Sequence, residues 1–168
     1  MDRYQITLVS LWIHVPFVIT WIGLVMLDGF ALFGPGLTDV QRKNILLWSR
    51  PFVVVAIPVI MVTGVWQTID NPFIPIHSYA NLDRLLHQTT YGRMLFFKHG
   101  CIVVTFALTV LVRFVLAPRA QAVVATSAVD ISMASDLTER WLRTATALNL
   151  ASCLAALLLA TRMVNELH

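Results

Sequence analysis

Three side chains within the long apolar stretches of this sequence could supply nitrogen atoms to one ligand: His14, Lys98 and His99. A polar side chain inside a membrane span is costly, so each of the three requires a partner or a function. His14 lies about nine residues after the start of its apolar stretch, and His99 about six residues after the start of its own. In a chain with four spans, the first and third spans begin on the same side of the bilayer. One ligand could therefore contact both histidines in the same half of the membrane.

The cofactor that such a pair favours is a single b-type haem. Haem iron takes one or two nitrogen or sulfur donors from facing helices. We expect His14 to be an axial ligand, with His99, Lys98 or a methionine opposite it. Two haems with bis-histidine ligation need four intramembrane histidines, and the expected spans hold two, so at most one such haem fits.

Other residues suit the remaining parts of a haem. The propionates of a haem pair with cations near the membrane surface, where we expect Arg84 and Arg93 to lie. Gly23 and Gly64 would let a flat macrocycle approach two helices closely.

Simpler interpretations of the same residues stay open. Each intramembrane histidine could do no more than hydrogen-bond a neighbouring helix. Lys98 and His99 point about 100° apart on a helix and are not expected to face one site together. Lys98 could instead extend to the outer interface. His77 and His87 belong to a polar connection, where a solvated histidine is more common than a metal ligand.

The composition indicates which solvent surrounds these residues. The 168 residues are 58% hydrophobic and 12% charged, whereas a soluble domain is about half apolar and a quarter charged. The sequence therefore predicts an integral membrane four-helix bundle of the all-α class, folded as one domain over residues 1–168. The expected spans are about 6–27, 45–69, 94–116 and 141–164, each long enough for a hydrocarbon core of roughly 30 Å. A polar loop, 37–44, is expected between the first two spans.

The ends of the spans carry weaker signals. We expect Asp28 and the Gly34-Pro35-Gly36 turn to end the first span, and Pro118 to end the third. Residues 81–88 could form a short helix that lies over the bundle. Ser135 and Asp136 with Glu139 resemble a capping signal for the last helix.

The cations indicate how the bundle is oriented. The twelve Lys and Arg residues are scattered beside apolar stretches, a pattern typical of the positive-inside bias and not of nucleic-acid binding. Seven of them gather on one side of the predicted bundle: Arg42, Lys43, Arg50, Arg113, Arg119, Arg140 and Arg143. The other five lie on the opposite side, together with both termini. We therefore expect the termini and the 70–92 connection to face outward.

Three motifs resemble those of a known family. The motif His14-x6-Trp21-x-Gly23 resembles the first helix of the CopD-type membrane proteins, which are copper-resistance protein D and its relatives. Ser49-Arg50 followed by Thr63-Gly64 resembles their second helix, and Tyr91-Gly92-Arg93-x4-Lys98 resembles their third. The three matches fall in order over the first 100 residues, and the fourth span is similar only in being apolar.

The resemblance extends to the related HemJ protoporphyrinogen oxidases. These are four-helix haem b proteins with a first-helix His, a Trp seven residues later and a third-helix Lys. The resemblance implies that His14 is a haem ligand, that Lys98 is functional and that Trp21 belongs to the site. The present sequence has a longer outer connection than HemJ and lacks much of its charged pattern after the first helix.

The leading hypothesis is a small membrane b-type cytochrome that holds one haem between spans one and three. It would act as an electron-transfer or accessory subunit of a larger membrane redox complex, or as a homo-oligomer, in a bacterial cytoplasmic (inner) membrane. Three alternatives remain: a copper transport or resistance protein whose metal uptake depends on His14, methionines and outer-loop histidines, a cofactor-free structural subunit, and a HemJ-like oxidase.

Overall fold

The computed structural model describes residues 3–69, 79–125 and 132–165, and within these ranges every regular element is helical. Four segments are long and apolar enough to cross a bilayer: Gln5–Phe33, Arg50–Ile69, Thr90–Ala122 and Asp136–Met163. Their outward faces carry exposed apolar side chains such as Trp12, Val62 and Leu158, each at least two-thirds exposed. A surface of this kind suits lipid tails and not water. The prediction of an all-α bundle with four helices long and apolar enough to span a membrane is confirmed for these parts of the chain.

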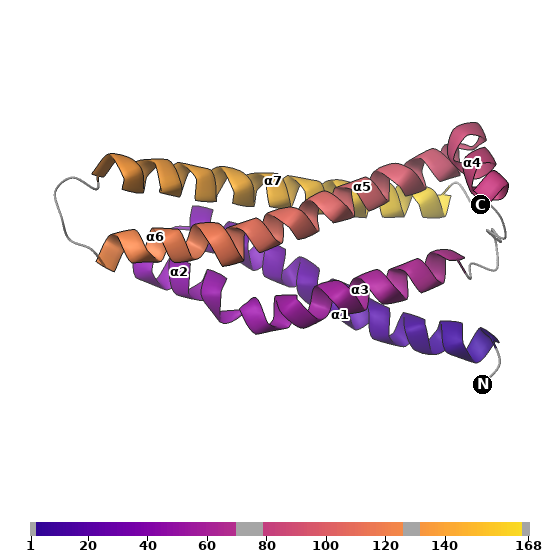
Figure 1. Ribbon diagram of the computed structural model, residues 1–168, viewed down its shortest axis with the longest axis horizontal. Coiled ribbons are helices and arrows are strands. Elements are labelled where there is room, and N and C mark those ends of the chain that lie inside the picture. The colour runs from indigo at the N-terminus through magenta and orange to yellow at the C-terminus, as the bar shows by residue number, and fades with distance from the viewer. Residues whose placement is uncertain (1–2, 70–78, 126–131, 166–168) are drawn as a thin grey trace.

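The long helices pack as an elongated bundle (Figure 1). Helix α1 (Arg3–Phe33) lies along α3 (Arg50–Ile69) and α7 (Ser132–Asn165). Helix α5 (Thr90–Val110) packs along α7 and continues through a π-helix, η1 (Leu111–Leu116), into α6 (Ala117–Ala125).

Two short helices lie at opposite ends of the bundle (Figure 1). Helix α4 (Tyr79–Gln88) packs on α5 at the end where α1 begins and α7 finishes. This confirms the short helix predicted over 81–88. Helix α2 (Asp39–Trp48) packs on α6 at the other end. We refer to the two halves of the bundle as the α4 half and the α2 half.

The second span begins later than the sequence suggested. The expected polar loop, 37–44, is largely occupied by α2, which has a capping box formed by Thr38 and Gln41. Helix α2 ends at Trp48, and α3 starts afresh at Arg50, so Pro51 lies in a first turn, where its missing N–H costs nothing. The prediction of one span from 45 to 69 was wrong in this respect.

Two other predicted boundaries also differ. The first helix, α1, continues past Asp28 to Phe33, so the predicted Gly34-Pro35-Gly36 turn ends it and Asp28 does not. The last helix begins at Ser132, so Ser135 does not cap it, and Glu139 instead pairs with Arg143 one turn later (Oε1 to Nε, 3.1 Å).

The third span continues through Pro118 because the helix widens before it. In η1 the Ala117 N–H bonds to the Val112 carbonyl, five residues back. In that register the Arg113 carbonyl would bond to the N–H of residue 118, which proline lacks. Arg50 Nε supplies the missing donor at 2.7 Å. The π-helix therefore accommodates Pro118 and ties α3 to the third span.

Candidate functional site

A cavity of about 510 Å³ lies in the α4 half of the bundle, between the four long helices. That volume is within the range of roughly 300–1,000 Å³ typical of cofactor pockets. Five residues singled out from the sequence line it: His14 and Trp21 from α1, Gly64 from α3, and Lys98 and His99 from α5. Segments far apart in the sequence therefore bring most of the candidate residues to one place.

The His14 ring is held in one tautomer by its neighbour on α3. Thr63 Oγ1 donates its proton to the Val59 carbonyl (2.6 Å), so it accepts from His14 Nδ1 (2.8 Å). In the neutral ring this leaves the Nε2 lone pair available to a ligand.

The His99 ring has the same arrangement. Its Nδ1 lies 2.7 Å from the Leu95 carbonyl, one turn earlier in α5, and a carbonyl oxygen can only accept. The Nδ1 atom therefore carries the hydrogen, and Nε2 carries the lone pair. Histidines that bind metals almost always donate their second ring nitrogen to a carbonyl or another oxygen, which fixes the ring orientation. Both cavity histidines satisfy this condition.

Small and aromatic side chains shape the cavity. A Cβ atom at Gly64 would lie 3.2 Å from His14 Cε1, so glycine leaves the space that this ring occupies. Trp21 is 4% exposed and packs on Phe106 of α5, with ring centroids 4.6 Å apart. This pair joins α1 and α5 and borders the cavity with flat apolar surface. The flat faces of these two rings suit a planar ligand.

The polar groups around the cavity are mainly hydrogen-bond donors. The indole Nε1 of Trp21 and the amide Nε2 of Gln67 are buried without partners in the part of the chain that the structure describes. Lys98 also lines the cavity, and none of its described neighbours forms an ion pair with it. The described lining includes neither Asp nor Glu. The cavity therefore suits an apolar molecule that brings its own acceptors or negative charge.

Lys98 and His99 line the cavity together, although they lie about 100° apart on α5. The expectation that they could not share a site was wrong here, because a cavity of this size covers a wide arc of the helix.

Some candidate residues lie elsewhere. Gly23 is exposed on α1, and a Cβ there would meet nothing within 4 Å. Arg84 and Arg93 are exposed and do not line the cavity. His87 is exposed on α4 and contacts Asp83 (Nδ1 to Oδ1, 3.1 Å). His77 lies outside the described residues.

The sequence analysis missed a buried ion pair in the α2 half. Arg113 Nη2 lies 2.7 Å from both carboxylate oxygens of Asp28, and both side chains are at most 1% exposed. Arg113 Nη1 also donates to Ser49 Oγ and to the Leu46 carbonyl (3.1 Å). One signal for this pair was available, because each charged residue has apolar residues on both sides along the chain.

Comparisons with protein families, characterised proteins and solved structures find no match to this chain. Among the described residues there is also no group of three or more His, Cys, Asp or Glu side chains that could hold a metal ion. The cavity lining offers two imidazole rings, the Lys98 ammonium group, the Gln67 amide, the sulfur atoms of Met61 and Cys153, and a mainly apolar wall.

Proposed function

We propose that this protein is a membrane b-type cytochrome that holds one haem b between α1 and α5, with His14 and His99 as axial ligands. The observation that carries the proposal is the shared state of the two rings. Each donates Nδ1 to an acceptor of the protein and keeps Nε2 for a ligand, and both line one cavity of cofactor size. When bound, haem b supplies a one-electron redox couple.

The chain's own residues would hold and tune this group. Thr63 and Leu95 orient the two imidazoles, and Gly64 leaves room beside His14. Trp21 and Phe106 exclude water from one border of the cavity. Lys98 and the orphan donor of Gln67 suit the carboxylates of the propionates, in place of the exposed Arg84 and Arg93. A dry pocket with fixed ligands is what sets the potential of a cytochrome.

The cavity supports copper less well. A copper ion needs two to four donors that converge on a point a few ångströms across. The described lining is instead spread over four helices and is mostly apolar, which favours an extended organic group. Met61 and Cys153 also line the cavity, so copper binding is a defined alternative outcome of the test.

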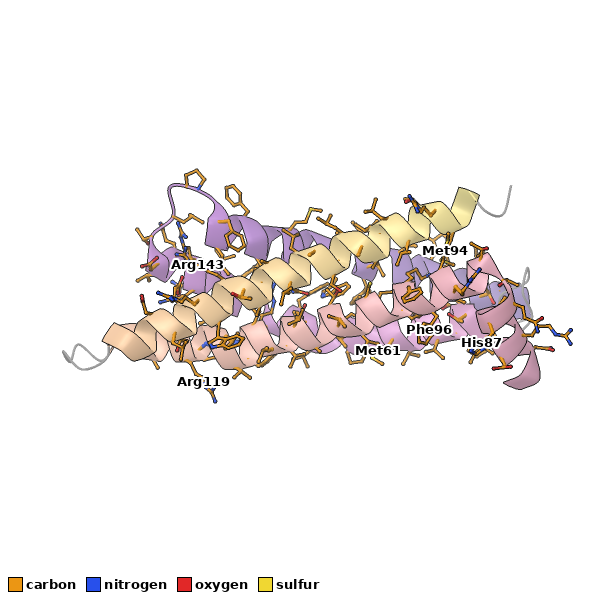
Figure 2. All side chains as sticks on the ribbon, turned by 90° about the horizontal axis from the view of Figure 1, so that it is seen from above. Met61, His87, Met94, Phe96, Arg119 and Arg143 are labelled. Carbon is orange, nitrogen blue, oxygen red and sulfur yellow. The ribbon has the colours of Figure 1, made fainter. Side chains whose placement is uncertain are left out.

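The setting that suits this function is a bacterial cytoplasmic membrane, with the α2 half toward the cytoplasm. Arg119 and Arg143 lie at that end, whereas His87 and Met94 lie at the other (Figure 2). Short cytoplasmic segments carry an excess of Lys and Arg. In this orientation α1 begins and α7 finishes on the outer side, and the protein passes electrons as a subunit of a larger redox complex.

The test is an absorption spectrum of the protein purified from cells supplied with haem precursors. We expect a Soret band at close to one haem per chain, lost in His14→Ala and in His99→Ala. His87→Ala is the matched control, because its ring is also hydrogen-bonded but lies outside the cavity. A stable, colourless wild-type protein contradicts the proposal, and one that instead retains copper supports the alternative.

A further inference from the structure

The polar residues that the haem site does not use form a column through the α2 half of the bundle. Thr105, Thr109 and Arg113 follow one another at four-residue intervals along α5 and η1. Thr146 and Asn149 of α7 lie on the facing side, and Asn149 Nδ2 donates to Thr109 Oγ1 (3.0 Å). Each of these five side chains is at most 1% exposed. So many buried polar groups in one line are costly in a membrane protein and indicate a function.

The column joins the cavity to the ion pair. At the end of the column toward the α4 half, Thr105 lines the cavity. At the opposite end, Arg113 pairs with Asp28. Gly29, next to Asp28, brings α1 against α7, since a Cβ there would lie 3.1 Å from Leu150, the neighbour of Asn149. Asp28 and Asn149 therefore lie at a similar level of the bundle.

Unpaired polar atoms mark the same line. Six buried side-chain atoms lack a partner in the described part of the chain: Trp21 Nε1, Gln67 Nε2, Thr146 Oγ1, Asn149 Oδ1, Arg113 Nε and Arg50 Nη2. The first two border the cavity, and the other four lie along the column or next to its end at Arg113. Buried polar groups without a protein partner are normally bonded to ordered water. The column therefore has the composition of a hydrated path.

We propose that this column is a water-filled proton route between the cavity and the α2 end of the bundle, with Asp28 as its proton-binding group. A proton enters beside the half-buried Arg50, binds the Asp28 carboxylate and passes along water held by Thr146, Asn149 and Thr109. It reaches the cavity at Thr105, which lines it. The route rests on the proposed function in one respect, because the haem is the group to which it would bring protons. An added positive charge favours the reduction of a haem in an apolar pocket.

The surroundings of Asp28 allow its charge to change. The cation that faces Asp28 is Arg113 from η1. Arg50 of α3 lies next to Arg113, because Arg50 Nε donates to the backbone carbonyl of Arg113. From α7 the facing groups are the neutral Thr146 and Asn149. Arg113 keeps two acceptors, Ser49 Oγ and the Leu46 carbonyl, when Asp28 is neutral. The guanidinium therefore stays in place while the carboxyl group gains or loses a proton.

The first experiment measures proton uptake by the haem-loaded protein. An electrode supplies one electron to each ferric haem without releasing protons of its own, and a pH-indicator dye in unbuffered solution counts the protons taken up. In Thr146→Val/Asn149→Leu we expect uptake at least tenfold slower than in wild type, with the Soret band unchanged. Asp28→Asn should lower the number of protons per haem. Thr161→Val is the matched control, because this threonine is exposed on the same helix. Uptake at the wild-type rate in the double variant contradicts the route.

The second experiment needs no haem and tests the water directly. In a Cys101→Ala/Cys153→Ala background, a thiol is placed in the column with Thr146→Cys or on the lipid-facing side of α7 with Leu148→Cys, which is 55% exposed. Aqueous Ag⁺ should react at least tenfold faster with the column thiol. Equal rates contradict a hydrated column. A wild-type protein without a Soret band would refute the proposed function, and this measurement would still decide the route.

Discussion

Both halves of the bundle contain costly polar groups, but the surroundings of these groups differ. In the α4 half, His14, His99 and Lys98 line a cavity, where their lone pairs and donors are available to a ligand. In the α2 half, the charged groups bond to the protein itself. Arg42 donates to three carbonyls near the end of α1, Lys43 donates to the Ala120 carbonyl, and Arg113 pairs with Asp28. The donors and lone pairs around the cavity can bind a ligand, whereas each of these charged side chains of the α2 half has at least one protein partner.

The largest effect should follow from breaking the ion pair in the α2 half. Asp28→Leu leaves Arg113 buried without its counter-charge, which costs about 3–5 kcal/mol. Arg113→Met likewise leaves the Asp28 carboxylate buried without its counter-charge. The double variant Asp28→Leu/Arg113→Met should recover most of the lost stability, because two apolar side chains need no counter-charge. Titration with SDS, monitored by circular dichroism, measures the free energy of unfolding of the three variants. A double variant as unstable as the sum of the single ones would contradict a pairwise role.

The next effect concerns the cavity and leaves the fold intact. Gly64→Leu places a side chain against the His14 ring and fills the space beside it. We expect haem affinity to fall at least 100-fold, or about 2.7 kcal/mol, while the thermal midpoint of the apoprotein changes little. Gly23→Leu is the control, since a Cβ at Gly23 meets open space. Equal haem binding by both variants would show that the ligand does not lie beside His14.

A smaller effect should follow from releasing the His14 ring. Thr63→Val keeps the shape of the side chain but removes the oxygen that accepts from Nδ1. Loss of such an orienting partner lowers metal affinity about 10–100-fold. Haem titration of the apoprotein measures the change, and Thr68→Val, one turn further along α3, is the control. An unchanged affinity would mean that Thr63 does not fix the ring.

The smallest effect is expected at the exposed end of α7. Glu139 and Arg143 form an i,i+4 pair whose arginine side chain is about half exposed. Such pairs contribute about 0.3–0.5 kcal/mol, so Glu139→Gln should change stability by no more than this in the same SDS titration. A loss as large as that of Asp28→Leu would remove the distinction between buried and exposed pairs.

Much of the fold could be predicted from the sequence, because apolar length is a strong signal for a membrane helix. The four spans, the short α4 helix, and the gathering of His14, Trp21 and Gly64 follow from hydrophobic stretches and from motifs at helical spacing. The extent of the third span could not be predicted. Pro118 normally ends a helix, and only the widening at η1 together with the Arg50 side chain lets it continue.

The ion pair between Asp28 and Arg113 could not be predicted, for a different physical reason. Asp28 has the position of a helix terminator, and Arg113 the position of a cytoplasmic cation, so each had an adequate local explanation. Their pairing depends on how α1 packs against η1, over a separation of 85 residues. The tautomers of His14 and His99 likewise depend on Thr63 and Leu95, and only the second of these partners lies one turn away on the same helix.

The most direct test of the central claim is a pulsed electron paramagnetic resonance spectrum of the ferric protein. Histidine is labelled with ¹⁵N in one sample, and lysine in another. We predict a low-spin haem coupled to two labelled histidine nitrogens, with no coupling from labelled lysine. A lysine nitrogen on the iron, or coupling to a single histidine in wild type, would contradict ligation by His14 and His99.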